Sequence, residues 1–495
     1  MAYDLYEDPH TQSLWIGTRS GLSIMNSDKP GEFINYKTIR LPYYIPFDEA
    51  NSIIRDRAGK MWIGTIGNGV YITDTKKPEF NLYQFKQKDE TITTTSVRSI
   101  FVDDDNYIWF GIGTYGIAGY DRKTDQYTYY ESLPEFAGFK SIPTVYAIMK
   151  RKQTGDLWFG TYDGGIYIYK KGEKTQHDSQ YNSDYIIHHC ITALYEDQKG
   201  NCWVGTREGL GVKRADGSGY LFNKIEIEGK NISSSYIRKI TEDNDNTIWI
   251  ATNNNGIIRM SGNISAPGTM TFKRYFYDNG GIEANSIQTL LSDSKGRLWA
   301  GTEGYGLYLY NKELDLFECK NTAYNLPCDM IGSIEEDFNG CLWIGTNIGL
   351  MKLNVSDDTE KATLHIYTAA DGLQDDFFIP RSSFVKNGEM FFGGYNGFNS
   401  FFPDSMPEET TDQTPLFITD IKIFNHSLSM LDEKTKKGIS AKEASYTDKI
   451  TLTYKQNNFS IEFASLTYKN PELNKYAYKL EGFDQKWNHV GDHRR

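Results

Sequence analysis

The chain has 495 residues with 45 Gly, 35 Tyr, 27 Phe and 9 Trp, and 14% of its residues are aromatic, which favours a turn-rich β protein. Its formal charge of -12 argues against a protein that binds nucleic acid, and no run of about 18 apolar residues could span a bilayer. The first residues, MAYDLYEDPH, lack the basic and apolar regions of a signal peptide. Five scattered cysteines favour free thiols over a disulfide framework or a zinc site, although Cys319 could pair with Cys328.

One segment recurs nine times along the chain. It begins as SLWIGTRSGLSIMN at residues 13–26 and ends as a divergent copy, EMFFGGYNGFNSFF, at residues 389–402. The aromatic anchors of the nine copies are Trp15, Trp62, Trp109, Trp158, Trp203, Trp249, Trp299, Trp343 and Phe391. Their spacing of 44 to 50 residues is typical of the four-stranded blades of a β-propeller. We expect the anchors to pack as core between neighbouring sheets.

The copy around Trp158 illustrates the four strands. Residues 144–150 (TVYAIMK) alternate as a first strand, LWFGT at 157–161 is the second, and IYIYK at 166–170 is the third. A more variable segment, such as QYTYYES at 126–132, supplies the fourth strand of a copy. The glycines after the Trp and before the third strand predict close backbone approach or a positive φ. The absence of a helical apolar period up to about residue 400 predicts an all-β fold with antiparallel blades.

The number of blades depends on how the last copy is completed. A Pro-rich, acidic stretch, PDSMPEETTDQTP, follows it at 403–415, where a fourth strand would begin. If FNLYQFK at 80–86 supplies that strand, copies three to nine form a seven-bladed β-propeller over residues 80–403. Residues 1–79 would then be two remnant blades of a preceding propeller. The alternative is that the first two copies belong to one larger ring of eight or nine blades.

Two parts of the chain resemble known modules. The pattern W-I-G-T-x-x-G, preceded by E-D-x-x-G as in Glu196 to Gly209, resembles the two-component regulator propeller repeat. After a linker at 404–415, residues 416–495 resemble the Y_Y_Y domain, which implies an Ig-like β-sandwich, incomplete here. The residues that carry this second resemblance are Tyr468, Asn470, Pro471, Tyr476, Tyr478, Leu480, Glu481, Gly482, Phe483 and Trp487.

This combination resembles the hybrid two-component sensors of gut Bacteroidetes. It implies that the chain is the periplasmic sensor region of an inner-membrane histidine kinase and response regulator, and a piece of a longer protein. We therefore expect no enzyme activity in this chain, no cofactor or metal, and contact with the membrane only through missing segments. The implied partner is an oligosaccharide or other glycan fragment whose binding controls polysaccharide utilisation. A signal that passes through paired membrane helices also implies a homodimer.

Two other functions fit the same repeats. One is a propeller-type enzyme that acts on glycans, as a lyase or a hydrolase. The other is a scaffold that docks proteins and binds no small ligand. Titration with oligosaccharides alongside a product assay would separate the three functions.

Ligands of propellers normally bind at the mouth of the central channel, which two kinds of loop build. Loops between second and third strands and loops that lead into first strands supply the candidate ligand-binding residues. These are Tyr115, Tyr146, Tyr162, Asp163, His188, Arg207, Glu208, Tyr236, Arg238, Asn253, Tyr305, Arg381, Tyr395 and Asn396, with Arg98, His189, Gln288 and Glu303 beside them. Tyrosine rings cover apolar sugar faces, and Asn, Arg and Asp pair with hydroxyls or anionic groups. Arg98, with Arg207, Arg238 and Arg381, could hold a uronate or a sulfate.

Two features that suggest a metal site have simpler explanations. The acidic turns at 103–105 and 242–245 recur at the same hairpin of the repeat and lack the Glu that ends a calcium loop, so we expect polar turns. His188 and His189 are adjacent, and successive residues of a regular strand point to opposite faces. We therefore expect that these two histidines do not share a metal ion.

Overall fold

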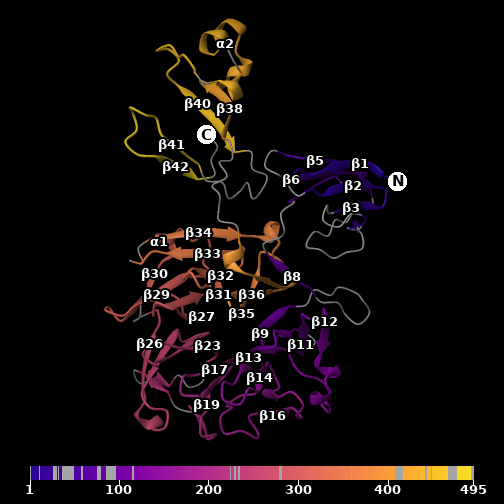
Figure 1. The fold of residues 1–495 in the computed structure, drawn as a ribbon. Coiled ribbons are helices and arrows are strands. Elements are labelled where there is room, and N and C mark those ends of the chain that lie inside the picture. The colour runs from indigo at the N-terminus through magenta and orange to yellow at the C-terminus, as the bar shows by residue number, and fades with distance from the viewer. Residues whose placement is uncertain are drawn as a thin grey trace. The chain divides into compact units, whose positions relative to one another are not determined.

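A computed structural model describes the chain apart from residues 1, 10–11, 26–30, 32, 36–48, 57–59, 68, 75–79, 85–95, 114–115, 223–224, 228–229, 232–234, 278–280, 358, 360, 407–415, 441–442, 448, 466–475 and 492–495. Nearly all of its elements are β-strands (Figure 1). The chain divides into two compact units, Met1–Met406 and Pro407–Arg495. All five cysteines are free. In the described part, no helix has both the length and the apolar composition that crossing a membrane requires.

Six four-stranded antiparallel sheets follow one another in chain order. The first three are β9–β12 (Val97–Val102, Ile108–Ile112, Gly116–Asp121, Gln126–Tyr129), β13–β16 (Val145–Lys150, Leu157–Thr161, Ile166–Tyr169, Gln176–Asp178) and β17–β20 (Ile191–Glu196, Cys202–Thr206, Gly209–Lys213, Gly219–Leu221). The next three are β23–β26 (Ile237–Glu242, Ile248–Thr252, Ile257–Ser261, Thr271–Tyr275), β27–β30 (Ile287–Ser292, Leu298–Thr302, Leu307–Asn311, Leu316–Cys319) and β31–β34 (Ile331–Glu336, Leu342–Thr346, Leu350–Val355, Ala362–Tyr367). A short hairpin, β21–β22 (Glu226–Ile227, Lys230–Asn231), and one helical turn, α1 (Asn321–Tyr324), interrupt the connections.

A seventh sheet closes the ring with a strand from far away in the sequence. It contains β35 (Phe378–Lys386), β36 (Glu389–Gly394) and β37 (Gly397–Phe401), and its outer strand is β8 (Asn81–Tyr83). Tyr83 pairs with Phe398, and their rings stack with centroids 4.5 Å apart. The first strand of each sheet packs against the first strand of the next, and β35 packs against β9. Seven sheets therefore form the propeller, as the pattern of copies three to nine predicts, and Asn81–Tyr83 of the predicted segment supplies the closing strand.

The first two copies form two sheets with a core of their own. They are β1–β4 (Ala2–Glu7, Leu14–Thr18, Gly21–Met25, Phe33–Asn35) and β5–β7 (Ala50–Arg55, Lys60–Thr65, Val70–Asp74). Trp15, Leu22 and Met61 are buried in the cluster between them, whereas Trp62 is half-buried. Leu5 and Ile54 are 60% and 64% exposed. Because a propeller blade normally buries both faces, this exposure is consistent with blades of a further propeller, which stays a prediction.

The second unit contains a three-stranded sheet and a separate hairpin. The sheet has β38 (Leu416–Ile423) between β39 (His426–Ser427) and β40 (Phe459–Ser465), and the hairpin pairs β41 (Tyr476–Tyr478) with β42 (Asn488–Gly491). The helix α2 (Glu433–Ile439) begins after Asp432, whose carboxylate accepts a hydrogen bond from the Thr435 N–H. Of the Y_Y_Y signature residues, Tyr476 is buried, Phe483 and Trp487 are largely exposed, and Tyr468, Asn470 and Pro471 lie outside the described residues.

Each tryptophan anchor donates its indole N–H to a side chain of the turn that precedes its strand. In six copies the acceptor is an Asp six residues earlier, at 2.7–3.1 Å: Asp56, Asp103, Asp197, Asp243, Asp293 and Asp337. In the other two, Asp156 accepts from Trp158 and Ser13 accepts from Trp15. The other oxygen of Asp243 accepts from the main-chain N–H groups of Asp245 and Thr247, which closes the turn. The acidic turns are thus structural.

The glycine two residues after the tryptophan, replaced by Ala251 in the copy around Trp249, permits close packing of neighbouring sheets. A Cβ atom on Gly160 would lie 2.6 Å from Ile191 of the next sheet, and one on Gly205 would lie 2.5 Å from Ile237. The glycine before each third strand has a positive φ, as at Gly165, and the preceding Thr161 hydroxyl donates to its carbonyl at 2.9 Å. Both glycine positions therefore have the roles that the repeat predicts.

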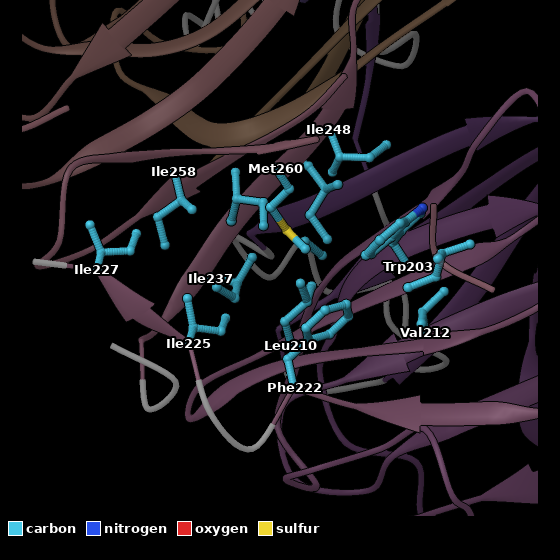
Figure 2. Close-up of a cluster of buried hydrophobic side chains, with 14 residues drawn as sticks. Trp203, Leu210, Val212, Phe222, Ile225, Ile227, Ile237, Ile248, Ile258 and Met260 are labelled. Carbon is cyan, nitrogen blue, oxygen red and sulfur yellow. The ribbon is translucent and has the colours of Figure 1, made fainter. Parts of the chain in front are cut away.

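Apolar side chains from adjacent sheets fill the space between blades. In the cluster of Figure 2, Trp203 and Val212 of one sheet pack with Ile237 and Ile258 of the next. The Trp203 ring stacks on Phe222 with centroids 5.9 Å apart. Of the nine anchors, all except Trp62 are buried. The cores of the ring therefore lie at the interfaces between sheets.

We predict that Asp243→Ala lowers the free energy of unfolding by about 1–3 kcal/mol, because it leaves the N–H of the buried Trp249 without an acceptor. The matched control is Asp245→Ala in the same turn, whose side chain is exposed and pairs only with an exposed Lys312. It should change stability by less than about 0.5 kcal/mol. Urea denaturation of the two variants measures the difference, and equal losses would contradict the assignment.

We also predict that the ring folds without the first two copies. In the described residues, the buried clusters of the ring contain no side chain before Phe80. A chain that begins at residue 77 should keep its β-sheet circular dichroism, with a shift in melting temperature below about 3 °C. Deletion to residue 84 removes β8 and should cause a much larger loss. If both deletions unfold the protein, the ring depends on residues 1–76.

Candidate functional site

Hydrogen bonds hold the two kinds of mouth loop together in the same blade. The first residue after the second strand donates its main-chain N–H to a carbonyl just ahead of the first strand. Tyr162 donates to Thr144 at 2.9 Å, and Asn253 donates to Tyr236 at 2.9 Å. The same bond joins Gly113 to Ser96, Arg207 to Cys190, and Glu303 to Ser286. The two loop sets therefore form one face, which we call the mouth.

Arg238 is the centre of a polar network on β23 and the following sheet. Its guanidinium donates to the side-chain oxygens of Asn253 and Gln288 and lies 3.3 Å from a Glu303 carboxylate oxygen. The same Glu303 oxygen accepts from Gln288 at 2.8 Å and from the Ser286 hydroxyl at 2.8 Å. This network holds Arg238 in one orientation and compensates its charge.

Arg381 extends from the seventh sheet across the channel. Its guanidinium donates to the main-chain oxygen of Arg238 at 3.4 Å and also to the side chain of Tyr236. Two sheets separate β35 from β23 in ring order, so this contact joins opposite parts of the ring. Burial, together with the charge of Arg238, lowers the pKa of Arg381 to about 10, so the group stays charged at neutral pH.

Tyrosine rings connect further arginines to this centre. The Arg98 guanidinium lies over the Tyr146 ring at 5.4 Å from its centroid, and the rings of Tyr146 and Tyr162 are 5.5 Å apart. Arg207 donates to the Tyr162 hydroxyl at 3.4 Å. Burial raises the pKa of Tyr146, and the neighbouring Arg98 opposes that rise.

Seven of these residues form one continuous group. Arg381 donates to Tyr236 and lies near Tyr146, and the Arg238 guanidinium lies over the Tyr236 ring at 5.5 Å. We call the group the arginine–tyrosine cluster: Arg98, Tyr146, Tyr162, Arg207, Tyr236, Arg238 and Arg381. It presents ring faces and N–H donors together, which is the chemistry of a site for a sugar or an anion.

Two histidines and two carboxylates lie next to the cluster. His189 is 2.7 Å from Asp163, and His188 is 3.8 Å from Glu208. The two imidazole rings stack with centroids 4.1 Å apart, in a bend before β17. The expectation that they point to opposite faces is therefore wrong, because they do not lie in a regular strand. In the described residues, no group of three or more His, Cys, Asp or Glu side chains is arranged to hold a metal.

The remaining predicted residues are not part of the cluster. Asn396 is held locally, since its amide donates to Asp375 at 2.9 Å and its main-chain N–H donates to Gln374. Tyr305 and Tyr395 are each 46% exposed, and Tyr395 packs beside Phe377. Asn253 participates through Arg238, and Tyr115 lies outside the described residues.

Sequence reasoning missed a second polar group in the channel. The hydroxyl of Ser383 on β35 donates a hydrogen bond at 2.7 Å to the carboxylate of Glu335 on β31, the first strand of the neighbouring sheet. Burial raises the pKa of Glu335, and the charge of Lys239 opposes this rise. The available signal was the presence of charged residues within first strands, as in IRKITE and IGSIEE.

A cavity of about 720 Å³ lies away from the mouth, among the turns between first and second strands. It is lined by acidic and basic side chains, among them Asp104, Lys150 and Lys170. Hydrogen bonds and charge from Lys150 and Lys386 lower the pKa of Asp104 to about 2. Because its opposite charges pair within the fold, this cavity is a weaker candidate site than the mouth.

Five of the nine copies match a known repeat family. Residues 44–67, 185–208, 231–254, 281–304 and 325–347 match the family described as "Two component regulator propeller". The chain is therefore a β-propeller protein in which five copies match two-component regulator propeller repeats, as the resemblance implies.

Known proteins extend this comparison. The chain is 29% identical over 340 residues to "Histidine kinase P4" of Formosa agariphila, a match that spans 67% of this chain and 24% of that protein. It is also similar to the extracellular domain of a hybrid two-component system of B. thetaiotaomicron, with a TM-score of 0.70 and 22% identity. That match covers all of this chain and 63% of the solved domain. A second extracellular domain of this kind from the same organism has a TM-score of 0.51 and 22% identity, and the match covers all of this chain and 64% of that domain. The chain thus spans a quarter of the kinase and less than two thirds of the solved domains.

The His188 environment predicts a dependence of stability on pH. Burial, aided by the neighbouring His189, lowers the pKa of His188 below its ordinary 6.5. The pKa of His188 is therefore lower in the folded chain than in the unfolded chain, where it is about 6.5. As the pH falls below about 6.5, the unfolded chain binds a proton at His188 more readily than the folded chain does, and the free energy of unfolding decreases. His188→Gln should reduce the loss of unfolding free energy between pH 7.5 and pH 5, as measured by urea denaturation. An unchanged loss would contradict this prediction.

Proposed function

We propose that this chain is the extracytoplasmic ligand-sensing region of a hybrid two-component histidine kinase and response regulator. It binds a glycan-derived oligosaccharide at the mouth of the propeller. The observation that carries the proposal is the arginine–tyrosine cluster, which places two neighbouring tyrosine rings, Tyr146 and Tyr162, beside guanidinium donors on one exposed face. The repeat family and the histidine kinase relative support the signalling role.

The mouth is suited to a binding role for a physical reason. Apolar ring faces cover the apolar faces of a sugar, and fixed N–H donors pair with its hydroxyls. The donors are held by the fold before a ligand arrives, as Arg238 is by Asn253, Gln288 and Glu303. Such preorganisation lowers the entropy that binding costs.

Signalling needs a second state of the receptor. A ligand shifts an equilibrium only by its difference in affinity for the two states. In this proposal the oligosaccharide favours one arrangement of the parent receptor in the periplasm, as a homodimer. The signal then passes through membrane segments outside this chain and controls polysaccharide utilisation.

We predict that Tyr146→Ala raises the Kd for a bound oligosaccharide at least about tenfold, because one stacking surface is lost. The matched control is Tyr395→Ala, a mouth tyrosine that is 46% exposed and outside the cluster. Its Kd should change by less than about twofold. Isothermal titration with a panel of plant and algal oligosaccharides provides both values.

The same titration separates the other functions. Samples recovered after binding are analysed for cleaved or unsaturated products. Binding without product supports the sensor, whereas turnover would identify a propeller enzyme. If no oligosaccharide of the panel binds and a protein partner does, the scaffold replaces the proposed function.

A further inference from the structure

Arg381 has an unusual backbone conformation. Its φ is +65°, in the left-handed region that non-glycine residues rarely adopt, and it directly follows Pro380. The pairing of β35 with β36 shifts register between Phe378 and Ser383, so Arg381 stands in an irregular part of the strand. A strained residue is retained where surrounding structure enforces it, and such residues cluster at functional sites. Here the strain places a guanidinium in the channel.

The charge of Arg381 has no compensating anion. Its two hydrogen-bond acceptors, the main-chain oxygen of Arg238 and the side chain of Tyr236, are uncharged. No carboxylate of the described residues forms an ion pair with it, and Arg238 is a second cation beside it. Because a guanidinium has five N–H donors, it retains several for another partner.

Other donors of the mouth are also uncompensated. Arg98 and Arg207 form no ion pair with a described carboxylate. Of the nearby acids, Glu303 pairs with Arg238, whereas Asp163 and Glu208 lie beside the two histidines. The arginine–tyrosine cluster itself contains four arginines and no carboxylate, so it is locally cationic in a chain whose formal charge is -12.

We propose that Arg381, with Arg98, binds an anionic substituent of the sugar ligand. The shared chemistry is that of an oxyanion with two or more equivalent oxygens, as in the carboxylate of a uronic acid or a sulfate ester. A guanidinium pairs with such a group through two parallel N–H bonds, which gives both strength and orientation. The inference rests on the proposed function, since it names the class of ligand for the same mouth.

A structural role for Arg381 makes the opposite prediction for stability. If its bonds to Arg238 and Tyr236 hold the ring together, removing the guanidinium destabilises the protein. If Arg381 is kept for an anion, removing it relieves an unpaired half-buried charge next to another cation. The variant without the guanidinium should then be at least as stable as the wild type when no anion is present.

The first experiment uses inorganic sulfate as the probe. Thermal melting of the whole chain is followed in sodium sulfate and in sodium chloride of equal ionic strength, for the wild type and Arg381→Gln. We expect sulfate to raise the wild-type Tm saturably, by about 2 °C or more beyond its effect on the variant. In chloride alone, the Arg381→Gln protein should melt no lower than the wild type.

Arg214→Gln is the matched control. Arg214 also donates to a main-chain oxygen, that of Ile264 at 3.2 Å, and lies over a tyrosine ring, Tyr220, at 5.4 Å. It should respond to sulfate as the wild type does. An equal sulfate effect in the wild type and Arg381→Gln, or a clear loss of stability of Arg381→Gln in chloride, would overturn the proposal.

A second experiment distinguishes the source of the anion from the proposed function. Isothermal titration compares oligogalacturonates, their carboxyl-reduced counterparts and sulfated galactose oligomers, on the wild type and Arg381→Gln. We expect either the oligogalacturonates or the sulfated oligomers to bind the wild type at least tenfold more tightly than the variant. The series that does so identifies the substituent as a carboxylate or a sulfate. Equal binding of the neutral set to both proteins would retain the proposed function and reject the anion site. A sulfate effect that depends on Arg381, with no oligosaccharide bound, would retain the anion site and reject the glycan.

Discussion

The bond between the tryptophan indole and the turn aspartate is the constraint around which each blade is arranged. The indole occupies the dry interface between two sheets, where an unpaired N–H is costly. Asp243 supplies the acceptor and also closes the turn through its other oxygen. One carboxylate thus connects the end of the blade to its core. Because the bond recurs at the opposite end of the strand from the mouth, the mouth loops are free to vary in sequence.

Local repetition explains why the sequence predicts so much of the fold. Each blade contains its own tryptophan, turn and glycines, so its strands can be predicted from the sequence of a single repeat of about 45 residues. Even the distant closing strand is predictable, because the last copy lacks a fourth strand and residues 80–86 lack a blade. The three-stranded sheet around β38 has no such repeat, and the repeat alone does not decide to which ring the sheet that contains the exposed Ile54 belongs. The boundaries of the flanking parts therefore stay predictions.

The candidate site is only partly predictable for the converse reason. Sequence places Tyr146 and Arg381 at the mouth but cannot show that Arg381 reaches β23 across the channel, because this depends on the closed ring. The stacking of His188 on His189 depends on a local bend, and the Ser383–Glu335 contact depends on which face of a first strand points inward. Residue types predicted the chemistry of the mouth, and three-dimensional proximity decided which residues act together.

The closing strand has a mechanical consequence. Asn81 pairs with Ser400, so the chain that enters β8 and the chain that leaves β37 lie at the same end of one antiparallel pair. Tension applied through both would peel this pair apart one hydrogen bond at a time, and would bypass the other six sheets. The Phe80 ring, 4.9 Å from Phe401 and 5.2 Å from Tyr367, resists the first step of that opening. A ring that is held together blade by blade can therefore still open under a pull along its own chain.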